Sequence, residues 1–117
     1  MEIQEFKTEQ YQVKYDSETT TIILAGSLRL SDLEESNLIV QLLNDVLDLQ
    51  PEQITLNLRS LEYLNSSGIN MLSKFVIQVR RIKTVNLTIL ASSEIPWQTK
   101  SLKNLQRLMP TLQLEVS

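Results

Sequence analysis

The chain has 117 residues, of which 42% are hydrophobic and 21% are charged, as in an ordinary single globular domain. It contains no histidine and no cysteine, which excludes histidine and thiolate metal sites, Ser-His-Asp triads, cysteine nucleophiles and disulfides. A net charge of −3 argues against nucleic-acid binding by phosphate neutralisation. Because there is no secretory signal pattern and no apolar stretch long enough to span a bilayer, we expect a soluble cytoplasmic protein.

The charges are unevenly distributed along the chain. Before Ser66 there are 4 basic and 12 acidic residues, a net charge of −8, and after it 7 basic and 2 acidic residues, a net charge of +5. We interpret this asymmetry first as opposite charges that neutralise each other across one fold, and second as a polar interaction surface.

The first predicted elements form a hairpin. Residues 11–15 alternate between apolar and polar side chains, which is the period of a strand with one buried face. Residues 16–19 have turn composition, and residues 20–28 are rich in β-branched and apolar side chains, so the two strands are expected to pair antiparallel. Residues 1–10 are expected to be a loosely ordered N-terminal segment.

A helix and a third strand are predicted next. Ser31 and Glu34 have the spacing of a capping box, so a helix should begin here, and Pro51 should make it end by about Leu49. The alternation of residues 54–59 then predicts a strand, followed by a loop.

The remaining elements alternate between helix and strand. Apolar residues at helical spacing predict a long amphipathic helix over residues 69–82. Residues 85–91 alternate as a strand, residues 97–108 form a short helix that Pro110 closes, and residues 112–116 form the last strand. The predicted fold class is therefore α/β, a single mixed β-sheet with helices packed on it in the order β-β-α-β-α-β-α-β, in one domain spanning residues 1–117.

A polar turn stands directly before the longest helix. Asn65, Ser66 and Ser67 occupy it, and their side chains are all good helix caps, so one interpretation is purely structural. The other is that one hydroxyl is phosphorylated, because the N-terminus of a helix accommodates the added negative charge.

Three segments give the chain a resemblance to a known family. Residues 24–28, residues 54–58 and residues 64–69, with the topology around them, resemble the STAS domain (sulfate transporter and anti-sigma-factor antagonist). The most specific piece is the hydroxyl-hydroxyl-glycine-aliphatic turn formed by Ser66, Ser67 and the two residues that follow.

The resemblance implies a non-catalytic signalling protein that needs no cofactor or metal. In such antagonists an ATP-dependent serine kinase of the anti-sigma type phosphorylates a serine in this turn, and a metal-dependent serine phosphatase reverses the reaction. The corresponding residue here is Ser66. Ser67 is the second candidate acceptor, with helix capping as its expected role. Phosphate on Ser66 would break the complex with the kinase by charge repulsion and desolvation cost.

One residue departs from the family pattern. Antagonists usually carry aspartate immediately before the phosphorylated serine, and this chain has Asn65. The amide can brace the turn by hydrogen bonding, but it carries no charge. The alternative function is therefore a constitutive STAS-type interaction or scaffold module that is not phosphorylated. An enzyme is the third class, for which the carboxylates of Asp32, Glu34 and Glu62 are the candidates.

The expected partner surface combines helix-face geometry with the resemblance. Trp97 is a further candidate as an interface anchor, although packing against the core is the expected role of a tryptophan that opens an amphipathic helix. No nucleic-acid or membrane partner is expected. The surface should comprise the turn, the polar face of the following helix and the segment after the second strand, namely Asn65, Ser66, Ser67, Gly68, Asn70, Ser73, Lys74, Arg29, Ser31 and Asp32.

Overall fold

The computed structural model describes residues 5–30 and 33–117. None of the helices in these ranges is both long enough and apolar enough to cross a membrane. Within them the elements are, in chain order, β1 (Glu5–Lys7), β2 (Tyr11–Asp16), β3 (Thr21–Leu28), α1 (Leu33–Asp48), β4 (Gln53–Leu64), α2 (Ser66–Arg81), β5 (Asn86–Ala91), α3 (Pro96–Leu108) and β6 (Gln113–Val116).

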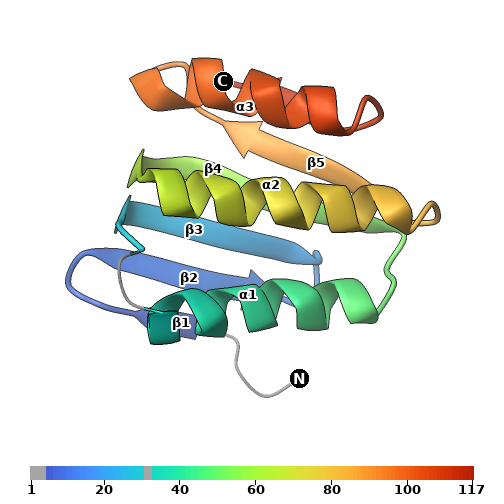
Figure 1. Cartoon of the computed structure of the whole chain (residues 1–117), viewed down its shortest axis with the longest axis horizontal. Coiled ribbons are helices and arrows are strands. Elements are labelled where there is room, and N and C mark those ends of the chain that lie inside the picture. The colour runs from blue at the N-terminus through green and yellow to red at the C-terminus, as the bar shows by residue number, and fades with distance from the viewer. Residues whose placement is uncertain (1–4, 31–32) are drawn as a thin grey trace.

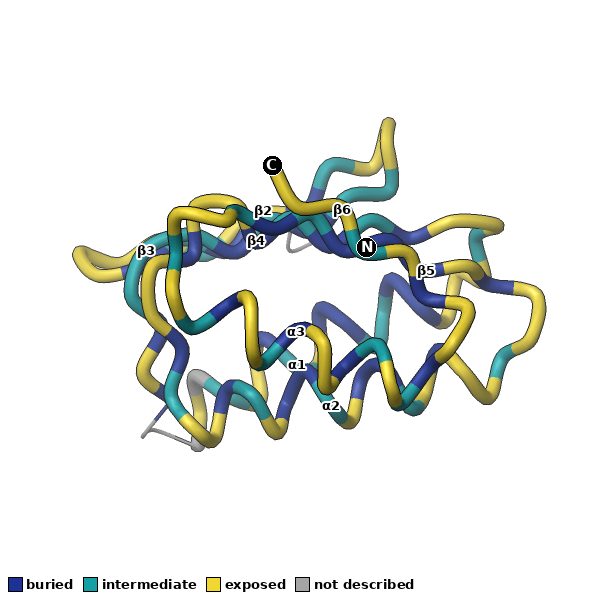
Figure 2. The backbone as a smooth tube through the Cα atoms, turned by 90° about the horizontal axis from the view of Figure 1, so that it is seen from above, coloured by how far each residue is buried: buried dark blue, intermediate teal, exposed yellow. Residues whose placement is uncertain are grey.

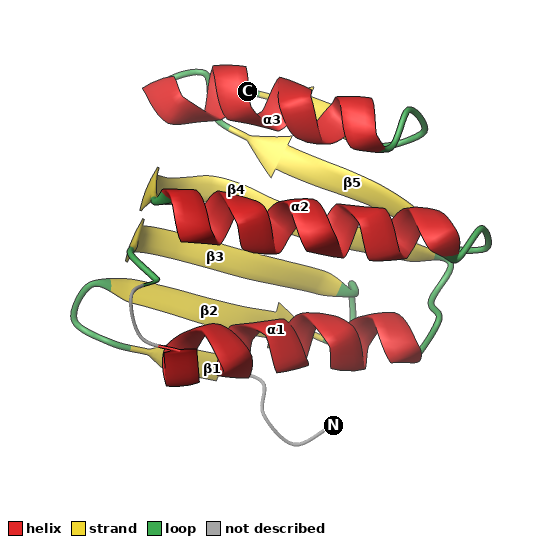
Figure 3. Ribbon diagram, viewed as in Figure 1, coloured by secondary structure: helices red, strands yellow, loops and turns green. Residues whose placement is uncertain are grey.

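The strands form one mixed sheet in the order β1-β2-β3-β4-β5-β6, so their order in space is their order in the chain (Figures 1 and 3). The first three strands pair antiparallel, and β3 to β6 pair parallel. The predicted mixed α/β sheet is confirmed.

All three helices lie on the same face of the sheet (Figure 2). Each strand-helix-strand connection moves one position along the sheet in the same direction. Connections of one hand that all move the same way place every helix on one face. The carboxyl ends of the parallel strands therefore meet at one edge of the sheet, where α1 and α2 begin (Figure 1).

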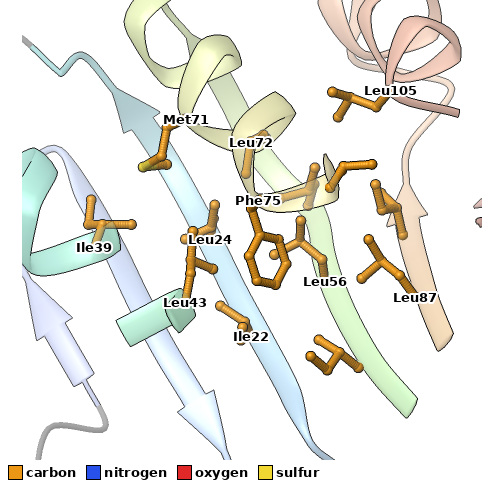
Figure 4. Close-up of a cluster of buried hydrophobic side chains, with 14 of the residues drawn as sticks. Ile22, Leu24, Ile39, Leu43, Leu56, Met71, Leu72, Phe75, Leu87 and Leu105 are labelled. Atoms are coloured by element: carbon orange, nitrogen blue, oxygen red, sulfur yellow. The ribbon is translucent and has the colours of Figure 1, made fainter. Parts of the chain in front are cut away.

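The core fills the layer between this face and the helices (Figure 4). Burial of a large aliphatic side chain contributes roughly 1.5–3 kcal/mol relative to leaving it exposed. The central members of the core come from both the strands and the helices, namely Ile22, Leu24, Ile39, Leu43, Leu56, Met71, Leu72, Phe75, Leu87 and Leu105.

The N-terminal segment differs from the sequence prediction. The first ten residues, expected to be loosely ordered, contain the short edge strand β1. It pairs antiparallel with β2, with Phe6 opposite Val13, and Phe6 packs partly against the core. Three residues are too few to show a recognisable period, which is why the sequence does not reveal the strand.

The fourth strand is longer than predicted. We expected a loop after Arg59, but β4 continues to Leu64. Its pairing with β3 shifts register twice. At these irregularities two successive side chains are exposed, first Arg59 with Ser60 and then Glu62 with Tyr63. An extra residue breaks the period of two, so the alternation that predicts a strand disappears although the strand continues.

Candidate functional site

Asn65 is the N-cap of α2. Its backbone is extended (φ −80°, ψ 177°), and its Oδ1 accepts a hydrogen bond from the amide of Gly68 at 3.0 Å. Its carbonyl accepts the first helical hydrogen bond, from the amide of Ile69 at 3.0 Å. The side chain therefore satisfies one of the amides that a helix start leaves without a partner.

The other end of the same amide side chain reaches a second element. Because the Gly68 amide can only donate, Oδ1 must face it, which turns Nδ2 toward the carbonyl of Leu30 at 3.4 Å. The backbone amide of Asn65 also donates to the carbonyl of Leu28 at 3.4 Å. Asn65 thus links the start of α2 to the segment that follows β3. An aspartate could keep the cap but could not donate to Leu30.

Ser66 and Ser67 occupy the first two helical positions, and both are exposed. The expected capping role of Ser67 is wrong, because Asn65 provides the cap. Neither hydroxyl forms a hydrogen bond within the described part of the chain, and the backbone amides of both residues also lack an acceptor there. The turn therefore presents two exposed hydroxyls beside two unpaired N–H groups.

Gly68 holds the start of α2 close to the end of β4. It is buried, and a Cβ at this position would collide with the side chain of Leu64. The same added atom would lie 3.4 Å from Oδ1 of Asn65. Glycine is thus required by close packing, and it keeps the cap and the two serines in place.

The other expected contact residues differ in availability. Asn70 and Lys74 are exposed on α2. Ser73 is half-buried, and its hydroxyl donates to the carbonyl of Ile69 at 3.0 Å, so its proton is already used inside the helix. Ser31 and Asp32, with the capping box expected there, lie outside the described residues.

Arg29 is exposed and belongs to a pair that we did not predict. Its guanidinium carbon lies 4.7 Å from the ring centroid of Tyr63, a cation–π contact, and Tyr63 is 41% exposed. Leu28 pairs with Leu64 in the sheet, so the pair lies at the edge where α2 begins. Arginine and tyrosine are enriched at binding hot spots. The sequence did not single out Tyr63, because it belongs to the second irregularity of β4.

Trp97 has the expected structural role. It is half-buried against the core, and its Nε1 donates to the carbonyl of Leu61 at 3.0 Å. That carbonyl is open because the pairing of β4 with β5 ends at Asn57 and Leu90. The indole therefore anchors α3 on the irregular part of β4.

Gln98 was missed by the sequence analysis. Only 1% of it is exposed, and its Nε2 donates to the carbonyls of Leu58 at 2.6 Å and Leu61 at 3.0 Å. Its Oε1 accepts from the amide of Ser92 at 2.8 Å. Its spacing of four residues from the buried Leu102 is the signal that could have placed it in the core.

Comparisons with known proteins support the fold alone. No family model matches the chain, and no curated protein matches it. Three similar solved structures are from Pseudomonas aeruginosa. A chain in the crystal structure of the diguanylate cyclase SiaD in complex with its activator SiaC is 11% identical, with a TM-score of 0.77 over 98% of this chain and 100% of that one.

The other two structures are described as SiaC and as apo-SiaC. One is 11% identical, with a TM-score of 0.73 over 98% of each chain. The second, apo-SiaC, is 9% identical, with a TM-score of 0.73 over 98% of this chain and 99% of that one. At these identities the likeness establishes that the chain has the same fold as SiaC over nearly its whole length.

Proposed function

We propose that this chain is a non-catalytic signalling protein that binds a protein partner through the start of α2, and that phosphorylation of Ser66 controls this binding. The observation that carries the proposal is the exposed Ser66 hydroxyl, which is not used by the fold because Asn65 caps the helix. The purely structural interpretation of the serines loses its main support for the same reason.

The turn suits a phosphoserine. Phosphate adds roughly −1.5 to −2 charges. It would lie beside the unpaired amides of Ser66 and Ser67 and the partial positive charge of the helix start, and the first turn of α2 contains no acidic residue. Asn65 places a neutral amide where an aspartate would repel the phosphate. Modification should therefore change the charge of the surface without unfolding the helix.

Phosphorylation of Ser66 would weaken the binding of a partner that recognises the unmodified turn. A partner that packs on Ser66 must remove the turn from water, and a doubly charged phosphate makes this costly unless cations meet it. Arg29 and Tyr63 at the same edge of the sheet extend the contact beyond the turn. The partner surface then comprises this pair together with Asn65, Ser66, Ser67, Gly68 and the exposed Asn70 and Lys74.

Two partner classes follow from two sources. The STAS resemblance favours a serine kinase of the anti-sigma type, opposed by a metal-dependent serine phosphatase. The structural likeness to SiaC, described as the activator of a diguanylate cyclase, favours a signalling enzyme as the regulated target. A module that can be phosphorylated can bind both partner classes, because the kinase and the target enzyme would contact the same residues at the start of α2 one after the other.

Capture experiments with four forms of the protein test the proposal. Immobilised wild type, Ser66→Ala, Ser66→Asp and the matched control Ser67→Asp are incubated with lysate of the source organism, and bound proteins are quantified by mass spectrometry. We expect a kinase or signalling enzyme to bind wild type and Ser66→Ala, and to be lost at least tenfold with Ser66→Asp. Loss with Ser67→Asp alone would assign the switch to the second hydroxyl.

The constitutive interaction module gives a different result. A partner that docks outside the turn should be captured equally by all four forms. The absence of the usual aspartate before Ser66 is the feature that favours this second function, and equal capture would establish it in place of the switch.

A further inference from the structure

The helices carry charges of opposite sign at the two ends of the molecule. The sequence of α1 contains four carboxylates and no basic residue, whereas α3 contains Lys100, Lys103 and Arg107 and no carboxylate. The helices lie in the order α1, α2, α3 along the sheet (Figure 1). Because the strands lie in chain order, the acidic first half of the chain forms one end of the sheet and the basic second half forms the other.

The helix dipole accounts for only part of these charges. In α1, Glu34 stands in the first turn and complements the dipole, but the last turn contains no basic residue, and Asp45 and Asp48 there face the partial negative charge of the C-terminus. In α3, Arg107 in the last turn complements the dipole, but the first turn contains no acidic residue, and Lys103 and Arg107 are like charges four residues apart, which repel on a helix. Asp45 of α1 and Lys103 of α3 therefore do not stabilise their own helices, which favours a role for them in contact between molecules.

Each end also exposes apolar surface next to its charges. On α1, Leu38 is 45% exposed and shares a helix face with Asp45, seven residues later. At the other end, Val116 is 53% exposed on the edge strand β6. It lines a hollow of about 50 Å³ between α3 and β6, together with Leu102, Lys103 and Leu114. One end therefore exposes Leu38 on the same helix face as Asp45, and the other end has a hollow that Lys103 helps to line.

We propose that copies of this chain associate head to tail, with Leu38 and Asp45 of one copy against the hollow and Lys103 of the next. The occupant of the basic end is a second copy because the chain itself supplies, at its other end, a surface of opposite charge that also exposes an apolar side chain. The contact joins two different surfaces, so it leaves one free surface of each kind at the ends of every assembly. Ser66 takes no part in it, so this inference does not depend on the proposed function.

Sedimentation velocity over micromolar to millimolar protein tests the inference. At about 0.01 M salt, where the Debye length is roughly 30 Å, we expect the average mass of the wild type to rise steadily past that of a dimer. At about 1 M salt, where the length is roughly 3 Å, the mass should fall toward that of the monomer. A constant monomer at low salt, or a plateau at the dimer, would overturn the proposal.

A charge exchange separates this contact from general charge attraction. Lys103→Glu and Asp45→Lys should each remain monomeric alone, because each places like charges across the contact. An equimolar mixture should associate as the wild type does, since every contact between unlike variants pairs opposite charges. Lys83→Glu carries the same charge change as Lys103→Glu at an exposed position just after α2, and it should associate normally. The head-to-tail contact would be contradicted by a mixture that stays monomeric, or by a control lysine variant that loses association as much as Lys103→Glu does.

Discussion

Substitution of Asn65 separates its two roles, because alanine removes both ends of the amide whereas aspartate removes only one. Asn65→Ala loses the acceptor for the Gly68 amide at 3.0 Å and the donor to the Leu30 carbonyl at 3.4 Å. Asn65→Asp keeps an acceptor for Gly68, and its charge faces the positive end of α2, but it cannot donate to Leu30.

The magnitudes follow from these contacts. Loss of an N-cap costs about 0.5–2 kcal/mol, and the 3.4 Å contact to Leu30 is long enough to add less than about 1 kcal/mol. For a domain of this size, 1 kcal/mol changes the melting temperature by about 4 °C. We therefore expect Asn65→Ala to cost about 0.5–3 kcal/mol in total and to lower the melting temperature by roughly 2–12 °C. Asn65→Asp should remain within about 1 kcal/mol of wild type, because a gain of about 0.3–1 kcal/mol from the helix dipole offsets the lost donor.

Urea unfolding followed by circular dichroism measures the free energy of unfolding for the three proteins, with Asn70→Ala as the control at an exposed helical position that makes no cap. The order of stability should be wild type and Asn65→Asp close together, with Asn65→Ala clearly below. If Asn65→Asp were as unstable as Asn65→Ala, the cap would not be the stabilising contact, and the exposed Ser66 hydroxyl would lose its explanation.

Two further substitutions test the packing that positions the turn. Gly68→Ala should lower the free energy of unfolding by about 1–3 kcal/mol, because the added methyl group collides with buried Leu64. If the variant unfolds at the same urea concentration as the wild type, the start of α2 is packed less tightly on Leu64 than this collision requires. Gln98→Leu keeps the volume but leaves the Leu58 carbonyl and the Ser92 amide without partners, so it should cost about 2–4 kcal/mol by thermal unfolding. A neutral result would mean that water replaces the glutamine.

Much of the fold could be predicted from periodicity. The helices and the regular strands have a clean period of 3.6 or 2 and well-placed prolines, so their order and approximate bounds agree with the structure. The errors fall where the period is interrupted. The second half of β4 contains two irregularities that expose Arg59 and Tyr63 out of phase, and local composition does not reveal which partner strand allows the extra residues.

The sequence predicts a candidate site at the turn before α2, but it does not predict the hydrogen bonds within that turn. Asparagine and serine are comparable helix caps, so composition could not decide whether Asn65 or Ser67 provides the cap. That choice depends on the residue at which α2 begins, which Gly68 sets by packing on Leu64. The contact of Arg29 with Tyr63 joins residues 34 positions apart, and only the register of β3 on β4 brings them together.

The most direct test of the central claim is to look for phosphate on Ser66 in protein isolated from its own cells. Trypsin should release residues 60–74 as one peptide that contains every serine of the turn, and fragmentation spectra can assign a phosphate to one hydroxyl. We predict a singly phosphorylated fraction of this peptide with the phosphate on Ser66, absent from cells that express Ser66→Ala. A peptide that is never modified under any growth condition, or one that carries phosphate only on Ser73, would contradict the proposed switch.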